Sequence, residues 1–321
     1  MADTNTKSPE GTTIRTLTPE DIDRVVEIDR AITKQSRRGF FEKRIEARRR
    51  EPTAFISLAY VEKGVVEGFL LAHVLDGEFG GRHPVAVLDA LGTTEAVRGH
   101  GGGRALMAEL EKIARGRGAK ELRTQSSWSD QQLTHFFAAA GLGLAHRLVL
   151  DRPCGKLANE QSIGETSQDD SRDLSRDVVP VRSMTLEDLP VVTGLDRRVT
   201  GRDRSGYYKR KVAEALQESG IRLSMIATVD KSPAGFVMAR VDYGEFGETE
   251  PEAVIDTIGV DPGFAGKRVG TAMISQLLAN LQSLRVERVR TEVDWDNFEL
   301  LAFLKGLGFQ PSQRLDFVRA L

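Results

Sequence analysis

The chain has 321 residues, of which 40% are hydrophobic, and carries 45 basic and 47 acidic side chains. This composition is typical of a globular protein, and the length is sufficient for two domains that each bury a core. The formal net charge of −2 gives no electrostatic reason to expect a nucleic acid or an anionic membrane as a partner.

The chain begins with a polar stretch, residues 1–12, which we expect to be disordered. This stretch has no apolar core of the kind that a secretory signal needs. No later apolar run approaches the roughly 20 residues of a membrane helix. The single cysteine, Cys154, excludes an internal disulfide and a thiolate zinc cluster. We therefore expect a cytoplasmic protein.

The two halves of the chain repeat each other without a gap from about residue 13 to residue 150, at an offset of 167 residues. The sequence Gly-Glu-Phe-Gly at 77–80 recurs at 244–247, and Asp89 recurs as Asp256. This period is too long for a solenoid and indicates two copies of one domain. We expect the domains at residues 13–152 and 180–321, joined by a flexible, polar linker at 153–179.

Each copy predicts the same order of elements, beginning with a short strand, a capped helix and an Arg/Lys-rich helix. Two alternating strands, a strand–loop–helix–strand unit, a further helix and a last strand that closes the copy follow. The expected positions, apart from that unit's first strand and helix, are 14–17, 37–50, 55–61, 68–75, 122–126 and 146–150 in the first copy and 181–184, 204–218, 223–229, 235–241, 289–293 and 314–318 in the second. Mostly antiparallel strands around one parallel unit predict a mixed α+β fold.

The stretch Val97-Arg98-Gly99-His100-Gly101-Gly102-Gly103-Arg104 joins the apolar run at 85–91 to a helix-like run. A glycine loop before a helix presents free amides and the positive end of the helix to an anion. The spacing matches neither the P-loop nor the dinucleotide fingerprint. An ordinary glycine-rich turn before a helix is the alternative interpretation.

Arg98, Gly101 and Gly103 fill the pattern Arg/Gln-x-x-Gly-x-Gly/Ala, and the chain thereby resembles the GNAT N-acetyltransferases. The order of elements in both copies and the ending at 303–309 are also similar to that superfamily. The resemblance implies two tandem GNAT folds, each a mostly antiparallel twisted sheet with a parallel strand–loop–helix–strand acyl-CoA site. It further implies that acetyl-CoA is the acyl-donor substrate.

The resemblance implies that the strand before each loop pairs with the pantetheine arm of CoA and that the loop holds the pyrophosphate. The residues implied in the first copy are Leu91, Gly92, Thr93, Arg98, Gly99, His100, Gly101, Gly102, Gly103 and Arg104. Those implied in the second copy are Ile258, Gly259, Val260, Gly266, Lys267, Gly270 and Asn297.

The second loop departs from the pattern, because Arg268 replaces the first required glycine and Ala265 the first polar residue. A side chain at Arg268 narrows the approach to the backbone and removes conformational freedom. In the alternative interpretation, the guanidinium of Arg268 binds phosphate directly. We expect the first copy to be the better CoA site.

Asp89 and Asp256 each lie in the middle of an apolar strand, and a carboxylate there needs a partner or a raised pKa. We name both, with Glu252 four residues before Asp256, as candidate general bases. The alternative is a structural role for these carboxylates. The position where many GNAT members carry a proton-donating tyrosine holds Phe137 and Leu304, neither of which can donate a proton.

No two histidines have the i, i+4 spacing of a helical metal site, and we expect no metal. The sequence thus favours an N-acetyltransferase that moves an acetyl or similar short acyl group from acyl-CoA to a primary amine of a small molecule or protein. A non-catalytic acyl-CoA-binding regulatory module is the alternative. The acceptor, the acyl length and the oligomeric state, a homodimer included, are left open.

Overall fold

A computed structural model describes residues 11–75, 79, 81–155, 178–213, 223–242, 244–247 and 250–321 of the chain. Most of the expected N-terminal tail (1–10), most of the expected linker (156–177) and part of the expected helix (214–218) lie outside the described residues. Thr12, which we placed in the tail, already begins the first strand. Within these ranges, no helix combines the length and the apolar character needed to cross a bilayer.

The first half contains the expected elements in the expected order. They are β1 (Thr12–Thr16), η1 (Pro19–Asp21), α1 (Ile22–Thr33), α2 (Arg38–Arg50), β2 (Phe55–Glu62), β3 (Val65–Leu75), β4 (Val85–Thr93), α3 (Gly102–Gly116), β5 (Glu121–Ser127), α4 (Gln131–Ala139), β6 (Gly143–Leu144) and β7 (Arg147–Pro153).

The second half repeats this order. Its elements are β8 (Val181–Ser183), η4 (Leu186–Asp188), α6 (Leu189–Thr200), α7 (Ser205–Ala213), β9 (Met225–Val229), β10 (Ser232–Asp242), η6 (Glu245–Gly247), β11 (Glu252–Val260), η7 (Pro262–Phe264), α8 (Val269–Ser283), β12 (Arg288–Asp294), α9 (Phe298–Gly306), β13 (Gln310–Pro311) and β14 (Arg314–Ala320).

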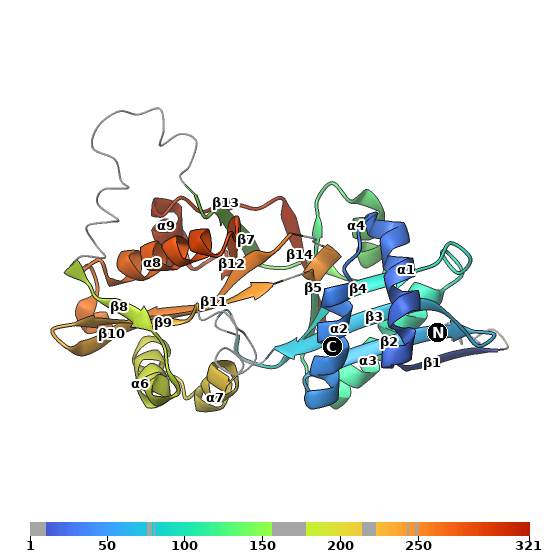
Figure 1. The fold of residues 1–321 in the computed structure, drawn as a ribbon, viewed down its shortest axis with the longest axis horizontal. Coiled ribbons are helices and arrows are strands. Elements are labelled where there is room, and N and C mark those ends of the chain that lie inside the picture. The colour runs from blue at the N-terminus through green and yellow to red at the C-terminus, as the bar shows by residue number, and fades with distance from the viewer. Residues whose placement is uncertain are drawn as a thin grey trace.

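The described strands form two seven-stranded, mostly antiparallel sheets, one in each lobe of the molecule (Figure 1). The first has the order β1-β2-β3-β4-β5-β14-β6, and the second has the order β13-β7-β12-β11-β10-β9-β8. In each sheet a single neighbouring pair, β4 with β5 and β11 with β12, is parallel. The mixed α+β fold expected from the sequence is therefore confirmed.

The two halves exchange their last long strands. β14, from the end of the chain, pairs with β5 in the first sheet, and β7 pairs with β12 in the second. In Figure 1, β14, at the red end of the colour scale, lies beside β5 of the first half. Our expectation that each last strand closes its own copy is wrong. β7 and β14 pair in equivalent registers, so sequence pattern alone cannot predict which of the two sheets each strand completes.

Each sheet lies between two apolar layers. In the first half, α1 and α2 pack on one face through a cluster that includes Phe41 and Phe69. On the other face, α3 and α4 pack through Leu106 and Phe137 against strand residues such as Leu88. Both faces of the sheet are therefore buried over most of its area, except at the edge that faces the second half.

Candidate functional site

The parallel strands β4 and β5 separate part-way along their length. They pair only at Val85–Glu121, Ala86–Leu122 and Val87–Arg123, while β4 continues to Thr93 and, among the described strands, pairs there with β3 alone. Beyond the pairs, the Thr124 hydroxyl donates to the Leu88 carbonyl at 3.0 Å and crosses the gap. Among the described strands, nothing pairs with the β5-facing edge of β4 from Leu91 to Thr93, where an extended amide chain can add by backbone hydrogen bonds.

The second half has the same separation between β11 and β12, which pair only over Glu252–Arg288, Ala253–Val289 and Val254–Arg290. The edge left by this separation includes Ile258, Gly259 and Val260. Both halves therefore leave an unpaired strand edge at the residues for which the resemblance implied pairing with the pantetheine arm.

The glycine in each of these edges has a packing role. A Cβ atom on Gly92 would lie 2.5 Å from the ring of Phe69, and one on Gly259 would lie 2.7 Å from the ring of Phe236. Both glycines are thus required because an aromatic ring on the neighbouring strand occupies the space where a side chain would be.

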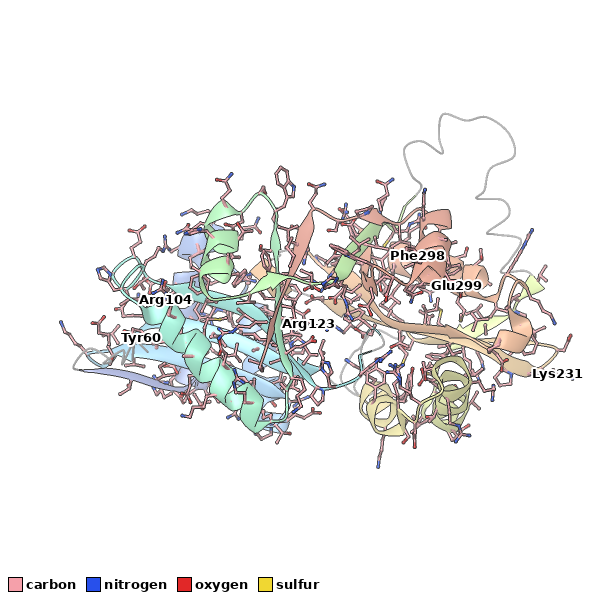
Figure 2. All side chains as sticks on the ribbon, turned by 180° about the vertical axis from the view of Figure 1, so that it is seen from behind. Tyr60, Arg104, Arg123, Lys231, Phe298 and Glu299 are labelled. Carbon is pink, nitrogen blue, oxygen red and sulfur yellow. The ribbon has the colours of Figure 1, made fainter. Side chains whose placement is uncertain are left out.

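The first glycine loop has the geometry of an anion-binding turn. Gly99 and Gly101 have φ angles of 79° and 94°, and Gly101 is the residue that caps the start of α3. Nothing lies within 4 Å of the Cβ position at either glycine, so the backbone is open to a ligand. The amides of the first turn of α3, which include those of Gly102 and Gly103, have no partner within the helix. Arg98, His100 and Arg104 are exposed around this turn, and Figure 2 shows Arg104 on the surface of the first lobe.

Gly103 and its counterpart Gly270 have another role than the loop glycines. A Cβ atom on Gly103 would lie 3.2 Å from the ring of Phe136, and one on Gly270 would lie 2.8 Å from the ring of Phe303. The second glycine of the motif thus permits close packing of the loop helix against the next helix.

The second loop keeps the backbone shape at a cost. Arg268 has a φ of 59°, in the left-handed region that Gly101 occupies in the first loop, and Gly266 has a φ of 75°. For a residue with a Cβ atom this conformation costs roughly 1–2 kcal/mol. Arg268 is exposed, and the ammonium of Lys267 lies 5.0 Å from the ring centre of Phe264.

The N-termini of α4 and α9 are capped by equivalent residues. The Asp130 carboxylate accepts from the Leu133 amide at 2.9 Å, and the Asn297 side-chain carbonyl accepts from the Leu300 amide at 3.2 Å. The side-chain oxygen of Asn297, for which the resemblance implied contact with CoA, therefore already has a structural partner.

Asp89 is the extra residue of a β-bulge. The register between β3 and β4 passes from Leu71–Ala90 to Ala72–Leu88, which leaves Asp89 unmatched. Its side chain is buried, and its carboxylate lies 2.8 Å from His73 Nδ1 and 3.4 Å from the Arg44 guanidinium. The bulge thus directs a carboxylate onto an imidazole, which fixes the orientation and the tautomer of the ring.

The second half has no imidazole at this place. Asp256 occupies the equivalent bulge, between the pairs Met238–Thr257 and Ala239–Ile255, and its carboxylate lies 3.4 Å from the Arg240 guanidinium. Arg240 stands where the first half has His73. Because arginine does not release a proton near neutral pH, Asp256 has no titrating partner of this kind.

Glu252, the third candidate base, belongs to a buried cluster of ion pairs. Its carboxylate accepts from Arg290 at 2.8 Å and lies 3.5 Å from Arg314 of the exchanged strand. The same Arg290 contacts Asp242 at 3.2 Å, and burial and the nearby Glu245 raise the pKa of Asp242 to about 7.

The turn η6 of the second half reaches into the first. Arg44 of α2 forms an ion pair with Glu245, and Arg37 donates to the carbonyl of Gly244. Burial alone would raise the pKa of Glu245, but Arg240 and Arg44 outweigh it and hold that pKa well below its usual range. His73, Asp89 and Glu245 offer ligand atoms within 4.8 Å of one another. The Arg44 guanidinium contacts both carboxylates and takes the place that a cation would occupy, so we assign no metal to this set.

A cleft that includes His73 and Glu245 lies at the junction of the halves, and Figure 2 shows Arg123 at that junction. The cleft is lined by His73, Leu75, Phe79, Gly81, His83, Val85, Val87, Arg123, Thr124, Gln125, Arg240, Glu245, Phe246, Arg290, Glu292 and Asp316. Burial, followed by the charge of Glu292, holds the pKa of Asp316 well above its usual range.

The sequence reasoning missed His73. Two features of the sequence pointed to it. A carboxylate such as Asp89 in an apolar strand needs a partner, and a histidine lies in the alternating strand before it. Strand alternation alone does not give the register between β3 and β4, which is what brings the two side chains together.

The profile described as the acetyltransferase (GNAT) family matches residues 22–143 and again residues 196–309. The chain belongs to the GNAT family. The two matches fall on the two halves of the repeat and together span most of the chain, which confirms the tandem organisation.

Solved structures show the same fold over the whole chain. A tandem GNAT protein from the clavulanic acid biosynthesis pathway covers 96% of this chain and 98% of its own, with 18% identity and a TM-score of 0.62. A GCN5-related N-acetyltransferase from Sphaerobacter thermophilus covers 98% and 97%, with 13% identity and a TM-score of 0.60.

A third similar structure is larger. It is the fungal multi-domain GH3 β-N-acetylglucosaminidase with a GCN5-related glucosamine N-acetyltransferase region, at 13% identity and a TM-score of 0.65. The match covers 97% of this chain and 38% of that one, so that our chain spans well under half of its length. At these low sequence identities, the similarity to the three structures shows a shared fold and nothing more. No curated protein matches the sequence.

Proposed function

We propose that the protein is an acetyl-CoA-dependent N-acetyltransferase with its active centre in the first half. The observation that carries the proposal is the buried His73–Asp89 pair, which lies beside the separation of β4 and β5 and faces the cleft. Only the first half combines this pair with a glycine loop that has no strained residue. GNAT membership supports the reaction class.

In this proposal the first half binds the donor substrate through its backbone. The amides from Arg98 to Arg104 hold the pyrophosphate at the start of α3, where the helix dipole and free amides favour an anion. The pantetheine arm pairs with Leu91, Gly92 and Thr93 of β4. The open Cβ positions at Gly99 and Gly101 fit this use.

His73 acts as the general base, and Asp89 acts through it. The carboxylate holds the proton on Nδ1, which leaves Nε2 to accept a proton from the acceptor ammonium. The free amine attacks the thioester carbonyl, a C–N bond forms, and the C–S bond of the tetrahedral intermediate breaks. The second proton of the amine nitrogen passes to the leaving thiolate, because Phe137 offers none. The products are the amide, CoA thiol and one proton.

The second half is proposed as a weaker acyl-CoA site. Ile258, Gly259 and Val260 would pair with the arm, and Gly266, Lys267, Gly270 and Asn297 would lie around the pyrophosphate and the base of the arm. Asp256 and Glu252 are the carboxylates available there, and both are paired to arginine.

A second candidate function is a non-catalytic acyl-CoA-binding regulatory module, favoured by the apolar residues at 137 and 304. Release of CoA thiol from acetyl-CoA in the presence of a panel of primary amines tests between the two. The enzyme should release thiol at a rate that depends on the amine and that His73→Gln reduces about a hundredfold or more. Tight binding of acetyl-CoA without thiol release for any amine would favour the regulatory module.

A further inference from the structure

The cleft has a continuous floor that crosses the first sheet. Side chains alternate between the faces of a strand, and Leu122 and Phe317 lie in the core beneath α3 and α4. Arg123 and Asp316, their chain neighbours, therefore lie on the opposite face with His73, and all three line the cleft. β3 and β14 are three strand spacings apart, or about 14 Å.

The end of this floor far from His73 carries buried acceptor atoms without partners. Asp316 is 5% exposed and Gln125, opposite it on β5, is 3% exposed. Gln125 donates its Nε2 to Glu292 at 2.7 Å. Asp316 Oδ2 and Gln125 Oε1 have no hydrogen-bond partner among the described residues. Buried polar atoms in proteins are nearly always paired, so these two call for a donor.

The cations around the cleft are already neutralised. Arg123 lies 2.5 Å from Glu121, Arg240 lies 3.2 Å from Glu245, and Arg290 lies 2.8 Å from Glu252. The cleft therefore has spare hydrogen-bond acceptors and a carboxyl group, Asp316, without a direct ion pair among the described residues. The raised pKa of Asp316 favours its neutral form until a cation binds beside it, and a bound ammonium favours the carboxylate. A ligand group that is positive and rich in N–H donors fits these atoms. A carboxylate would offer them no donor and would lie beside Asp316 and Glu292, of which Glu292 is already paired with Arg147 at 3.2 Å.

We propose that the acceptor is a primary amine that carries a second ammonium group, held by Asp316, Gln125 and Glu292 while the reacting amine lies at His73. This inference rests on the proposed function, since it identifies the substrate class of that active centre. The binding group comes from β5, β12 and β14, so β12 of the second half and the exchanged strand β14 complete the acceptor site.

Three probes with eight carbon atoms each test the distal group: 1,8-diaminooctane, octylamine and 8-aminooctanoic acid. They end in an ammonium, a methyl group and a carboxylate. Binding of each to the full-length protein is measured by calorimetry, and turnover is measured by release of CoA thiol from acetyl-CoA. The diamine should bind at least about tenfold more tightly than octylamine and should have a correspondingly lower KM, as expected for a charge-assisted hydrogen bond in a buried site.

Asp316→Asn removes the charge with little change of shape and should bring the KM ratio of octylamine to diamine close to 1. Asp294→Asn is the matched control, because this half-exposed carboxylate lies near the same strands but does not line the cleft. Its KM ratio should equal that of the unmodified protein.

Equal use of octylamine and diamine, or a preference for the aminocarboxylic acid, would overturn the diamine inference and leave the acetyltransferase proposal intact. Binding of the diamine without turnover of any amine would support the cleft as its site and overturn the acetyltransferase proposal. If the protein neither binds nor acetylates the diamine, the diamine inference is refuted.

Discussion

At the scale of single residues, the difference between the halves that matters for the proposed chemistry is the partner of one carboxylate, which is His73 for Asp89 and Arg240 for Asp256. Asp89→Asn should lower the turnover rate by about a hundredfold or more, because the amide no longer fixes the tautomer of His73. The affinity for acetyl-CoA, measured by calorimetry, should stay nearly the same, since the carboxylate does not contact the loop.

Asp256→Asn is the matched control for this change, since it alters the equivalent bulge in the second half. It should leave turnover within a few-fold of the unmodified protein. If Asp256→Asn and Glu252→Gln abolish turnover while Asp89→Asn does not, the active centre is in the second half.

A second prediction at this scale concerns acid stability. Two hydrogen bonds from Arg182, at 2.6 and 2.7 Å, and the amide of Thr185 lower the pKa of Asp188 to about 2. Because the folded pKa lies below the unfolded one of about 3.9, Asp188 stabilises the fold above that pH and the contribution is lost between about pH 4 and pH 2. Asp188→Asn should reduce the free energy of unfolding by about 1–2 kcal/mol at pH 7 and abolish this pH dependence.

The free energy of unfolding of the second half, measured by denaturant titration at pH 7, 4 and 3, tests this effect. Glu187→Gln, a neighbouring exposed carboxylate in the same turn, is the control and should show no comparable loss. Equal loss of stability at pH 7 and pH 3 in Asp188→Asn would contradict the assignment.

At the scale of elements, the two glycine loops are a built-in comparison. Gly101→Arg introduces into the first loop the left-handed arginine of the second and fills a space that is open. The affinity for acetyl-CoA should fall by more than tenfold, or roughly 1.4 kcal/mol. Calorimetry on the unmodified protein should show one tight site per chain, and Arg268→Gly should strengthen the weaker one. Two equal sites that survive Gly101→Arg would refute the assignment of the loop.

The order and type of the elements could be predicted from the sequence, whereas their pairing could not. Both capping turns occur where the pattern Thr-x-x-Asp places them, since the cap depends on residues three apart. The bulges at Asp89 and Asp256 and the contact of His73 depend on register between strands. Register is set by packing of the whole sheet, which no local pattern records.

At the scale of the molecule, the exchange of β7 and β14 bears on whether the two halves fold independently, as two copies of one domain would. Cleavage between residues 155 and 178 should leave two pieces that stay associated, because each piece supplies a strand to the other's sheet. Size-exclusion chromatography after proteolysis should show both pieces in one peak. The piece that ends near residue 155, expressed alone, should aggregate or fold poorly because β5 becomes an exposed edge. A monomeric, folded first piece would contradict this prediction.

The exchange also bears on how the protein is made. The first half leaves the ribosome before the second, yet its sheet waits for β14 (Arg314–Ala320), which follows every other described strand along the chain. Pairs such as Gln125–Asp316 join residues far apart along the chain, and contacts of this kind slow folding. During synthesis the edge of β5 is open while the second half is translated, a state that is prone to wrong pairing. The proposed acceptor site contains Asp316 and therefore forms only after β14 has left the ribosome, so a ribosome that stops before β14 releases a chain without this site.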